Sequence, residues 1–229
     1  MSSAGSFKHD LFAEFARIGK ALSSGNRLEL LEFLAQGERG VEALARVAGL
    51  TTANTSAHLQ QLRRTGLVTA RKEGQTVYYR LAGEDVVTLL ECLRRVAEAH
   101  LAEVSRLAHT YLTAKDSLEP VPAKELLGRA REGFVTVIDV RPREEYAAGH
   151  VPGALSVPLA ELEKHLVDLP HDTEVVAYCR GPYCVLAYEA VARLRTLGFS
   201  ARRLEDGFPE WKQAGLPVDE GIPKTDKPK

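Results

Sequence analysis

The chain has 229 residues, of which 45% are apolar and 27% charged, and its formal net charge is −1. These values describe an ordinary soluble globular protein whose length fits two modest domains better than one. No apolar run reaches the ~18 residues that a membrane-spanning helix needs, and the N-terminus lacks the basic start and apolar stretch of a signal peptide. The sequence therefore argues against membrane and secreted classes, and we expect a cytoplasmic protein.

The chain contains three cysteines, Cys92, Cys179 and Cys184. An odd number of cysteines in a reducing compartment argues against a disulfide framework and leaves reactive or metal-binding thiols. Two of them stand close together in the segment YCRGPYCV, residues 178–185. This spacing raises three interpretations: a metal clip, a disulfide, or a nucleophile for sulfur. The odd cysteine count argues against the disulfide, and the sequence offers no second ligand pair for a zinc clip.

The N-terminal half predicts helices followed by one hairpin. Apolar residues recur at helical spacing in four segments: 11–22, 28–34, 41–47 and 51–65. The hydroxyl of Thr51 or Thr52 is suited to cap the fourth helix. Strand patterns at 67–71 and 76–81 then flank a turn that contains Gly74. Two helices around a tight turn, with this hairpin behind them, form a winged helix-turn-helix pattern.

The fourth helix has the residue types of a DNA-recognition helix. Thr55, Leu59 and Leu62 share one face, which we expect to point inward. The opposite face is small and polar, so it can approach base edges closely, and its amides can pair with adenine. The residues expected to face DNA are Thr52, Ala53, Asn54, Ser56, Ala57 and Gln60.

The hairpin adds positive charge to the same region. Residues 51–81 carry five basic side chains and a single acidic one, Glu73. We expect Arg71 and Lys72 to meet DNA phosphates, although a solvated basic surface would have the same composition.

A long amphipathic segment follows the hairpin. From Val86 to Tyr111, apolar residues recur at steps of four and three over about three and a half heptads. This pattern predicts one helix on the order of 40 Å long. We call this apolar stripe the seam. A small domain cannot cover so long a stripe by itself, so we expect a second copy of the chain to pack on it in a homodimer.

The order of these elements, with LTTANTSAHLQQLRRTGLV before RKEGQTVYYRLA, resembles the winged helix-turn-helix of ArsR-type bacterial repressors. The resemblance implies that residues 1–113 form a dimeric DNA-binding domain, in which the first and last helices make the interface. Its two recognition helices would lie about 34 Å apart and would bind a pseudo-palindromic double-stranded operator. Metal sensors of this family carry ligand sets that are incomplete here. His100 and Glu103 have a two-ligand spacing, but we favour a seam histidine, and we read Cys92 as a small buried residue.

The C-terminal half alternates strands and helices. After a polar, proline-containing linker at 114–121, buried strands are expected at 134–140, 174–178 and 201–204, and helices at 159–166, 185–197 and 208–214. This alternation predicts a mainly parallel sheet flanked by helices, with ligand sites at the carboxyl ends of the strands. Cys179 falls at such an end, where backbone N–H groups and a helix N-terminus stabilise a thiolate.

The segments IDVRPREEYAAGHVPGALSVPL, VVAYCRGPYC and DGFPEW, in this order, resemble a single rhodanese domain, assigned to residues 122–219 with a flexible tail at 220–229. The resemblance implies that Cys179 accepts sulfane sulfur as a persulfide. Arg180 could assist the thiolate, and Gly181, Pro182 and Tyr183 would complete the loop. The other matching positions are interpreted as structural support for that loop: Asp139, Arg141, Glu145 and His150.

The loop departs from the family at Cys184. Thiosulfate-using rhodaneses commonly carry a cation at this position, so the departure argues against thiosulfate as the donor. Cys184 could resolve a Cys179 persulfide, or it could be a small residue packed inward.

Two functions follow from these domains. The first is a DNA-binding regulator, most simply a repressor, in which sulfur loading of the rhodanese domain changes operator affinity. The second is a sulfurtransferase whose helix-turn-helix only dimerises or places it. We favour the first, with operator DNA, a second copy of the chain and a small sulfur donor such as polysulfide, persulfide or thiosulfate as partners. No cofactor or metal is expected.

Overall fold

The computed structural model describes residues 3–113 and 119–221, and the chain divides into two compact units, Met1–Leu90 and Glu91–Lys229. The division falls inside a helix rather than at the predicted linker, so it differs from the predicted domain boundary. Within the described ranges, no helix combines the length and apolarity needed to cross a membrane.

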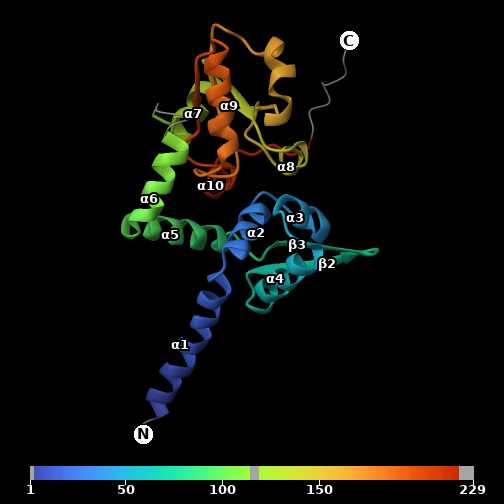
Figure 1. The fold of residues 1–229 in the computed structure, drawn as a ribbon, viewed down its shortest axis with the longest axis vertical. Helices are drawn as coiled ribbons and strands as arrows, with labels where there is room; N and C mark the ends of the chain where they lie inside the picture. Colours follow the sequence, from blue (N-terminus) through green and yellow to red (C-terminus); the bar gives the residue numbers. More distant parts are fainter. Residues whose placement is uncertain (1–2, 114–118, 222–229) are drawn as a thin grey trace. The chain divides into compact units, whose positions relative to one another are not determined.

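The first unit is the winged helix-turn-helix that the sequence predicts (Figure 1). Its core contains Leu30, Leu44, Leu59 and Leu62, all fully buried. The three strands pair antiparallel in the order β1-β3-β2, and β2 and β3 form the wing. The elements are α1 (Ser3–Leu22), α2 (Gly25–Ala35), β1 (Arg39–Gly40), α3 (Val41–Val47), α4 (Thr52–Arg64), β2 (Val68–Glu73) and β3 (Thr76–Leu81).

The first wing strand, β2, runs closer to the turn than predicted, to Glu73 instead of residue 71, whereas β3 has its predicted bounds. Register pairs continue to Glu73 and Thr76, which leaves only Gly74 and Gln75 between the strands. Gly74 has a positive φ of 60°, a conformation that suits glycine in a two-residue hairpin turn.

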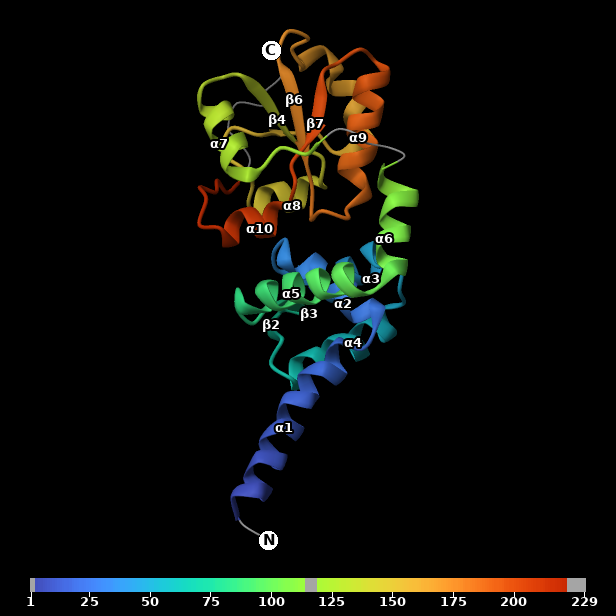
Figure 2. The same cartoon turned by 90° about the vertical axis from the view of Figure 1, so that its left-hand side faces the viewer.

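Helix α1 leaves an apolar face in solvent. Its N-terminal part has no other element beside it in either view of the ribbon (Figures 1 and 2). Phe7, Phe12 and Phe15 are 68%, 57% and 58% exposed.

The predicted long seam helix is broken. The structure has α5 (Asp85–His100), then α6 (Ala102–Ala108) and a π-helical turn, His109–Thr113. Leu101 between them has extended backbone angles, φ −111° and ψ 98°, which end the helical hydrogen-bond pattern. The sequence has neither glycine nor proline at this point, so the apolar periodicity runs through the break unmarked. The prediction of one continuous helix is wrong.

The second unit contains the predicted parallel sheet, in the order β5-β4-β6-β7. Alternate strand residues point to two separate cores: Ile138 and Ala177 pack on the α9 side, and Val137 and Tyr178 on the α7 side. Figure 2 shows α7 and α9 on opposite sides of the sheet. The elements are α7 (Ala123–Arg131), β4 (Val135–Asp139), α8 (Arg143–Ala148), β5 (Leu155–Ser156), η2 (Leu159–Asp168), β6 (Glu174–Tyr178), α9 (Val185–Thr196), β7 (Ala201–Arg203) and α10 (Phe208–Gln213).

Several details of this unit differ from the prediction. Helices α7 and α8 and strand β5 were not foreseen, and the predicted helix at 159–166 is the 3-10 helix η2. In the predicted linker, residues 114–118 lie outside the described residues, but Val121 is fully buried and bridges to Leu204. At the other end, Gly221 of the predicted tail donates its N–H to the Ala147 carbonyl, and 222–229 lie outside the described residues.

Candidate sulfur-transfer loop and DNA-binding surface

Residues 179–184, named here the sulfur loop, connect β6 to α9. Cys179 directly follows β6 and is 2% exposed, and Cys184 is the N-cap residue of α9. Their Cα atoms are 6.3 Å apart and the structure joins the two side chains in a disulfide. This pair closes one short loop and links no distant elements, so it is no disulfide framework. The sequence analysis argued against a disulfide, and the structure has one between these two cysteines, so that expectation is corrected.

The start of α10, Gly207 and Phe208, packs against the backbone of the sulfur loop. Phe208 donates its N–H to the Cys179 carbonyl at 3.0 Å. Gly207 touches the loop so closely that a Cβ atom there would overlap the backbone of Arg180 and Gly181. Position 207 therefore requires glycine because the two backbone segments approach closely there.

Arg180 is committed to a carboxylate. Its Nη2 lies 2.7 Å from Glu145 Oε1 and its Nε 3.0 Å from Glu145 Oε2, and the Glu145 side chain is fully buried. This fork-shaped contact anchors the start of the loop on α8. The predicted assistance of Arg180 to the thiolate stays a prediction; in the structure its guanidinium is ion-paired with Glu145.

A second buried ion pair lies below the loop. Arg141 Nε is 2.9 Å from Asp139 Oδ1, and both side chains are fully buried. Tyr178, next to Cys179 in sequence, donates its hydroxyl to Asp139 Oδ2 at 2.6 Å and accepts the Val151 N–H at 3.1 Å. Burial, together with Asp139, raises the pKa of Tyr178 well above its ordinary value. Tyr178 therefore stays a protonated donor, a role that the sequence reasoning missed.

His150 is also structural in its contacts. It is buried, stacks on Tyr146 with 3.7 Å between ring centroids, and its Nδ1 lies 2.9 Å from the Tyr146 carbonyl. Tyr146 in turn donates its hydroxyl to the Ala154 carbonyl at 2.8 Å. All four predicted support residues are therefore buried and bonded within the rhodanese half, and their support of the sulfur loop stays a prediction.

In the first unit, α4 has the predicted two faces. Thr55, Leu59 and Leu62 are fully buried, whereas Thr52, Ala53, Asn54, Ala57 and Gln60 are exposed and Ser56 is half-buried. The Thr51 hydroxyl accepts the Asn54 N–H at 3.2 Å and caps the helix. From α2, the buried Arg27 donates to Gln61 Oε1 at 3.2 Å and to the Lys20 carbonyl at 2.9 Å. Arg27 therefore links the C-terminal end of α4 to the C-terminal end of α1, a role that the sequence analysis did not predict.

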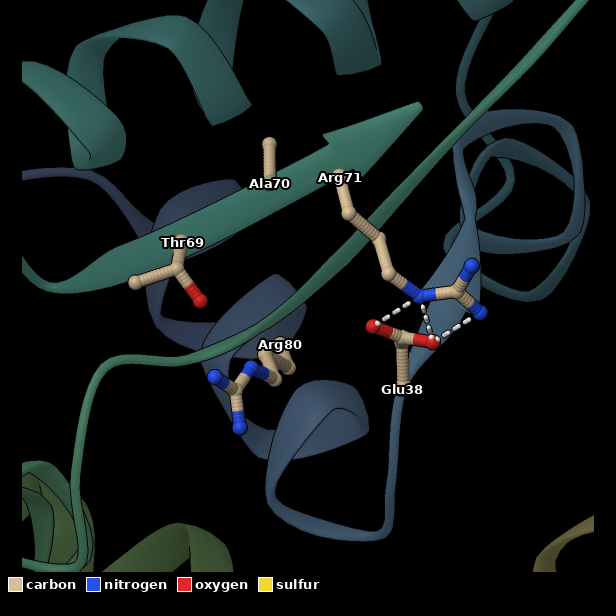
Figure 3. Close-up of a pocket in the computed structure, with 5 residues that line it drawn as sticks. All are labelled: Glu38, Thr69, Ala70, Arg71 and Arg80. Atoms are coloured by element: carbon tan, nitrogen blue, oxygen red, sulfur yellow. Dashed lines mark hydrogen bonds and ion pairs between the residues drawn. The ribbon is translucent and has the colours of Figure 1, made fainter. Parts of the chain in front are cut away.

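On the wing, Arg71 forms ion pairs with two carboxylates, Glu38 and Glu73. Its Nε donates to Glu38 Oε2 at 2.8 Å, it forms a second ion pair with Glu73, and its guanidinium carbon lies 4.7 Å from the Tyr78 ring centroid. Hydrogen bonds to Glu38 and Glu73 raise the pKa of Arg71. Figure 3 shows Arg71 turned toward Glu38 beside a hollow that Thr69, Ala70 and Arg80 also line. The predicted phosphate contact by Arg71 therefore competes with two carboxylates, while Lys72 is exposed.

The two residues considered for a metal contact do not form a site. Glu103 accepts hydrogen bonds from Arg106, with Nε at 2.7 Å, and His100 is exposed. Among the described residues, no three His, Cys, Asp or Glu side chains gather where they could hold a metal ion.

The fold and the loop define a winged helix-turn-helix joined to a rhodanese domain. Residues 24–70 match the bacterial regulatory protein, arsR family, and residues 122–214 match the rhodanese-like domain family. The chain is 50% identical to the HTH-type transcriptional regulator Rv0324 of Mycobacterium tuberculosis over 216 residues, 94% of this chain and 95% of that one. It belongs to this family of ArsR-type transcriptional regulators with a C-terminal rhodanese domain.

Each half also has relatives of its own. The rhodanese half is 33% identical to a sulfurtransferase of Allochromatium vinosum over 85 residues, 37% of this chain and 78% of that protein. The other half is 48% identical to the homodimeric winged helix-turn-helix DNA-binding domain Mb0332 from Mycobacterium bovis, solved in solution. That match covers 44% of this chain and 91% of the other, with a TM-score of 0.40.

Proposed function

We propose that this transcriptional regulator binds a pseudo-palindromic operator as a homodimer, and that sulfane sulfur taken up on Cys179 changes its operator affinity. The observation that carries the proposal is the sulfur loop itself. A buried cysteine at a strand end has a second cysteine within bonding reach, and a frame of buried ion pairs holds the loop in place. A regulator that carries such a loop has a chemical input for its DNA-binding half.

The chemistry takes two steps. The Cys179 thiolate attacks the outer sulfur of a donor persulfide, the donor S–S bond breaks, and the donor leaves as a thiolate, so that Cys179 holds a persulfide. The Cys184 thiolate then attacks the Cys179 Sγ, and the outer sulfur leaves as hydrosulfide. The sulfane sulfur is reduced to sulfide while the two thiols are oxidised to the disulfide. Two equivalents of a cellular thiol then reduce the disulfide by way of a mixed disulfide, which restores the dithiol and leaves the cellular thiol as its own disulfide.

The electrostatics of the loop favour persulfide or polysulfide as the donor over thiosulfate. A dianion such as thiosulfate needs positive charge beside the nucleophile, but Arg180 is paired with Glu145 at 2.7 Å, and a cysteine stands at position 184. A persulfide or a singly protonated polysulfide carries one negative charge on its sulfur chain, so it depends less on such a cation.

On the DNA side, the exposed face of α4 is suited to read bases in the major groove, and Lys72 on the wing to meet phosphate. The exposed apolar residues of α1, α5 and α6 supply a surface for a second copy of the chain. We place this regulator in the cytoplasm, with its DNA.

A second candidate function is sulfur transfer to an external thiol, with the helix-turn-helix used only for dimerisation or placement. The resemblance of residues in the rhodanese half to a sulfurtransferase favours it. It predicts sulfur turnover without any effect on DNA.

The test combines mass spectrometry with operator binding. An operator is first selected from a random DNA library with the reduced protein, and inorganic polysulfide is then added. Wild type should gain sulfur on the Cys179 peptide and change its operator affinity. Cys179→Ser should lose both responses, whereas Cys184→Ser should load sulfur and form no intramolecular disulfide.

Two outcomes contradict the proposal. Sulfur on Cys179 with no change in DNA binding favours the sulfurtransferase. A DNA response that survives Cys179→Ser moves the sensor to another residue.

A further inference from the structure

The second half of helix α5 holds two side chains that bond residues around the sulfur loop. Arg94 Nη1 lies 3.1 Å from Glu210 Oε1, and Glu98 accepts a hydrogen bond from the Tyr183 hydroxyl. Arg94 and Glu98 are four positions apart, so they lie on the same face of the helix. All four residues belong to the unit Glu91–Lys229. We refer to these four residues as the α5 contact.

The first partner, Tyr183, is part of the sulfur loop. It lies between Cys179 and Cys184 and is the immediate neighbour of Cys184. Partial burial and the hydrogen bond to Glu98 raise the pKa of Tyr183, so its hydroxyl remains a donor at neutral pH. A change in the position of Cys184 is therefore passed directly to a side chain that touches α5.

The second partner, Glu210, is bonded at both of its oxygens. Oε1 contacts Arg94, and Oε2 accepts the Gly207 N–H at 3.0 Å. Gly207 packs on the loop backbone, and Phe208 holds the Cys179 carbonyl at 3.0 Å. The Arg94 and Glu210 side chains are only 26% and 12% exposed, so solvent screens this ion pair less than an open surface pair. Two separate routes thus lead from the sulfur loop to one face of α5.

We propose that Tyr183 and Glu210 are positioning residues that transmit the state of the sulfur loop to helix α5. This inference rests on the proposed function, because it supplies the physical link between sulfur chemistry and the DNA-binding half. The disulfide holds Cys184, and with it Tyr183, in the position that reaches Glu98. In the dithiol or persulfide that covalent constraint is absent, and the α5 contact weakens. Leu93 and Val96, which lie beside Arg94, are exposed apolar residues, so a shift of α5 changes the surface offered to a second copy.

Hydrogen exchange on the full chain tests the link without DNA. Backbone amides in residues 91–100 are compared between the disulfide form and the dithiol form. Wild type should show slower exchange in the disulfide form, by roughly fivefold or more, the usual lower range of coupling between sites. Tyr183→Phe, which keeps the ring and removes the hydroxyl, should lose most of this difference, and Arg94→Gln should reduce it.

Two control variants separate a relay from a general loop effect. Tyr188 also donates its hydroxyl to the loop, at the Pro182 carbonyl, 3.1 Å away, but it belongs to α9 and is not one of the four residues of the α5 contact. Tyr188→Phe should therefore keep the exchange difference. Glu98→Gln keeps an oxygen acceptor for Tyr183 and should retain more of the difference than Glu98→Ala.

Operator binding then distinguishes failure of this inference from failure of the proposed function. If polysulfide changes wild-type operator affinity, Arg94→Gln, which lies outside the sulfur loop, should load sulfur on Cys179 as wild type does and show a smaller change in operator affinity. The relay is overturned if wild type shows no exchange difference between the two forms. It is also overturned if Tyr183→Phe and Arg94→Gln both keep the wild-type difference. A relay seen by exchange with no polysulfide effect on DNA overturns the proposed function alone.

Discussion

At the scale of single residues, the sulfur loop could be located from sequence, but the contacts around it could be predicted only in part. Cys179 and the four supporting residues could be located because the segments around them resemble those of rhodanese domains, and Cys184 because it departs from that pattern. Tyr178 could not, because an aromatic residue in a buried strand has the same pattern whether or not its hydroxyl holds Asp139. The pairing of Arg180 with Glu145 joins residues 35 positions apart, a contact that only the folded chain defines.

Gly207 provides a test at this scale. A Cβ atom at position 207 would overlap the loop backbone, so Gly207→Ala must displace the sulfur loop. We expect a loss of about 1–3 kcal/mol in the free energy of unfolding, the usual cost of overpacking. Sulfur loading on Cys179 should fall as well. Urea unfolding and peptide mass spectrometry measure the two effects.

Gly128 is the matched control. It lies in α7, and a Cβ atom there would meet no neighbour within 4 Å. Gly128→Ala should raise the free energy of unfolding by about 0.4–1 kcal/mol through the unfolded chain. Equal stability changes at the two positions would mean that Gly207 is not a close-approach site.

At the scale of elements, helices and strands with clear periodicity were predicted and those defined by long-range contacts were not. The recognition helix and the wing follow from local patterns. The break at Leu101 does not, because the apolar steps continue from α5 into α6. Short elements such as α8 and β5 depend on the completed sheet, so they give little periodic signal.

The wing supplies a prediction of its own. Glu38 competes with DNA phosphate for Arg71, which it contacts at 2.8 Å. Glu38→Gln should weaken this competition and raise DNA affinity. If Arg71 then gains a phosphate contact, the slope of log affinity against log salt should steepen by roughly 0.9.

Removal of any acidic residue raises affinity for DNA somewhat, so a matched charge change is needed. Glu42, exposed on α3, serves this purpose. Glu42→Gln should leave the salt slope unchanged. The wing assignment fails if both variants change the slope equally, as measured by fluorescence anisotropy over a series of salt concentrations.

At the scale of the whole molecule, the two fold classes were evident from sequence, and the division between compact units was not. Residues 91–113 have the amphipathic pattern of a dimerisation helix and were assigned to the first domain on that basis. The structure places them in the compact unit Glu91–Lys229, in which Arg94 and Glu98 bond to residues of the rhodanese half.

The oligomeric state follows from the exposed apolar face of α1. We expect twice the chain mass of 25.1 kDa in solution, measured by light scattering. Phe12→Asp combined with Phe15→Asp should give monomers. The double variant loses apolar contacts in the interface, and dimerisation would bury two carboxylates without partners, which is unfavourable. Val167→Asp, at a 90% exposed position of the rhodanese half, should remain dimeric. A wild-type protein that scatters as a monomer refutes the interface.

The α5 contact has an evolutionary consequence. A regulator acquires a new input by gene fusion only if the added domain can reach an element that already moves in the regulator. Here the receiving side consists of two polar side chains on one helix face, Arg94 and Glu98. A fusion could therefore become regulatory through few substitutions. We expect ArsR-type relatives without a rhodanese domain to place unrelated residues at these two positions, since nothing there selects for the pair.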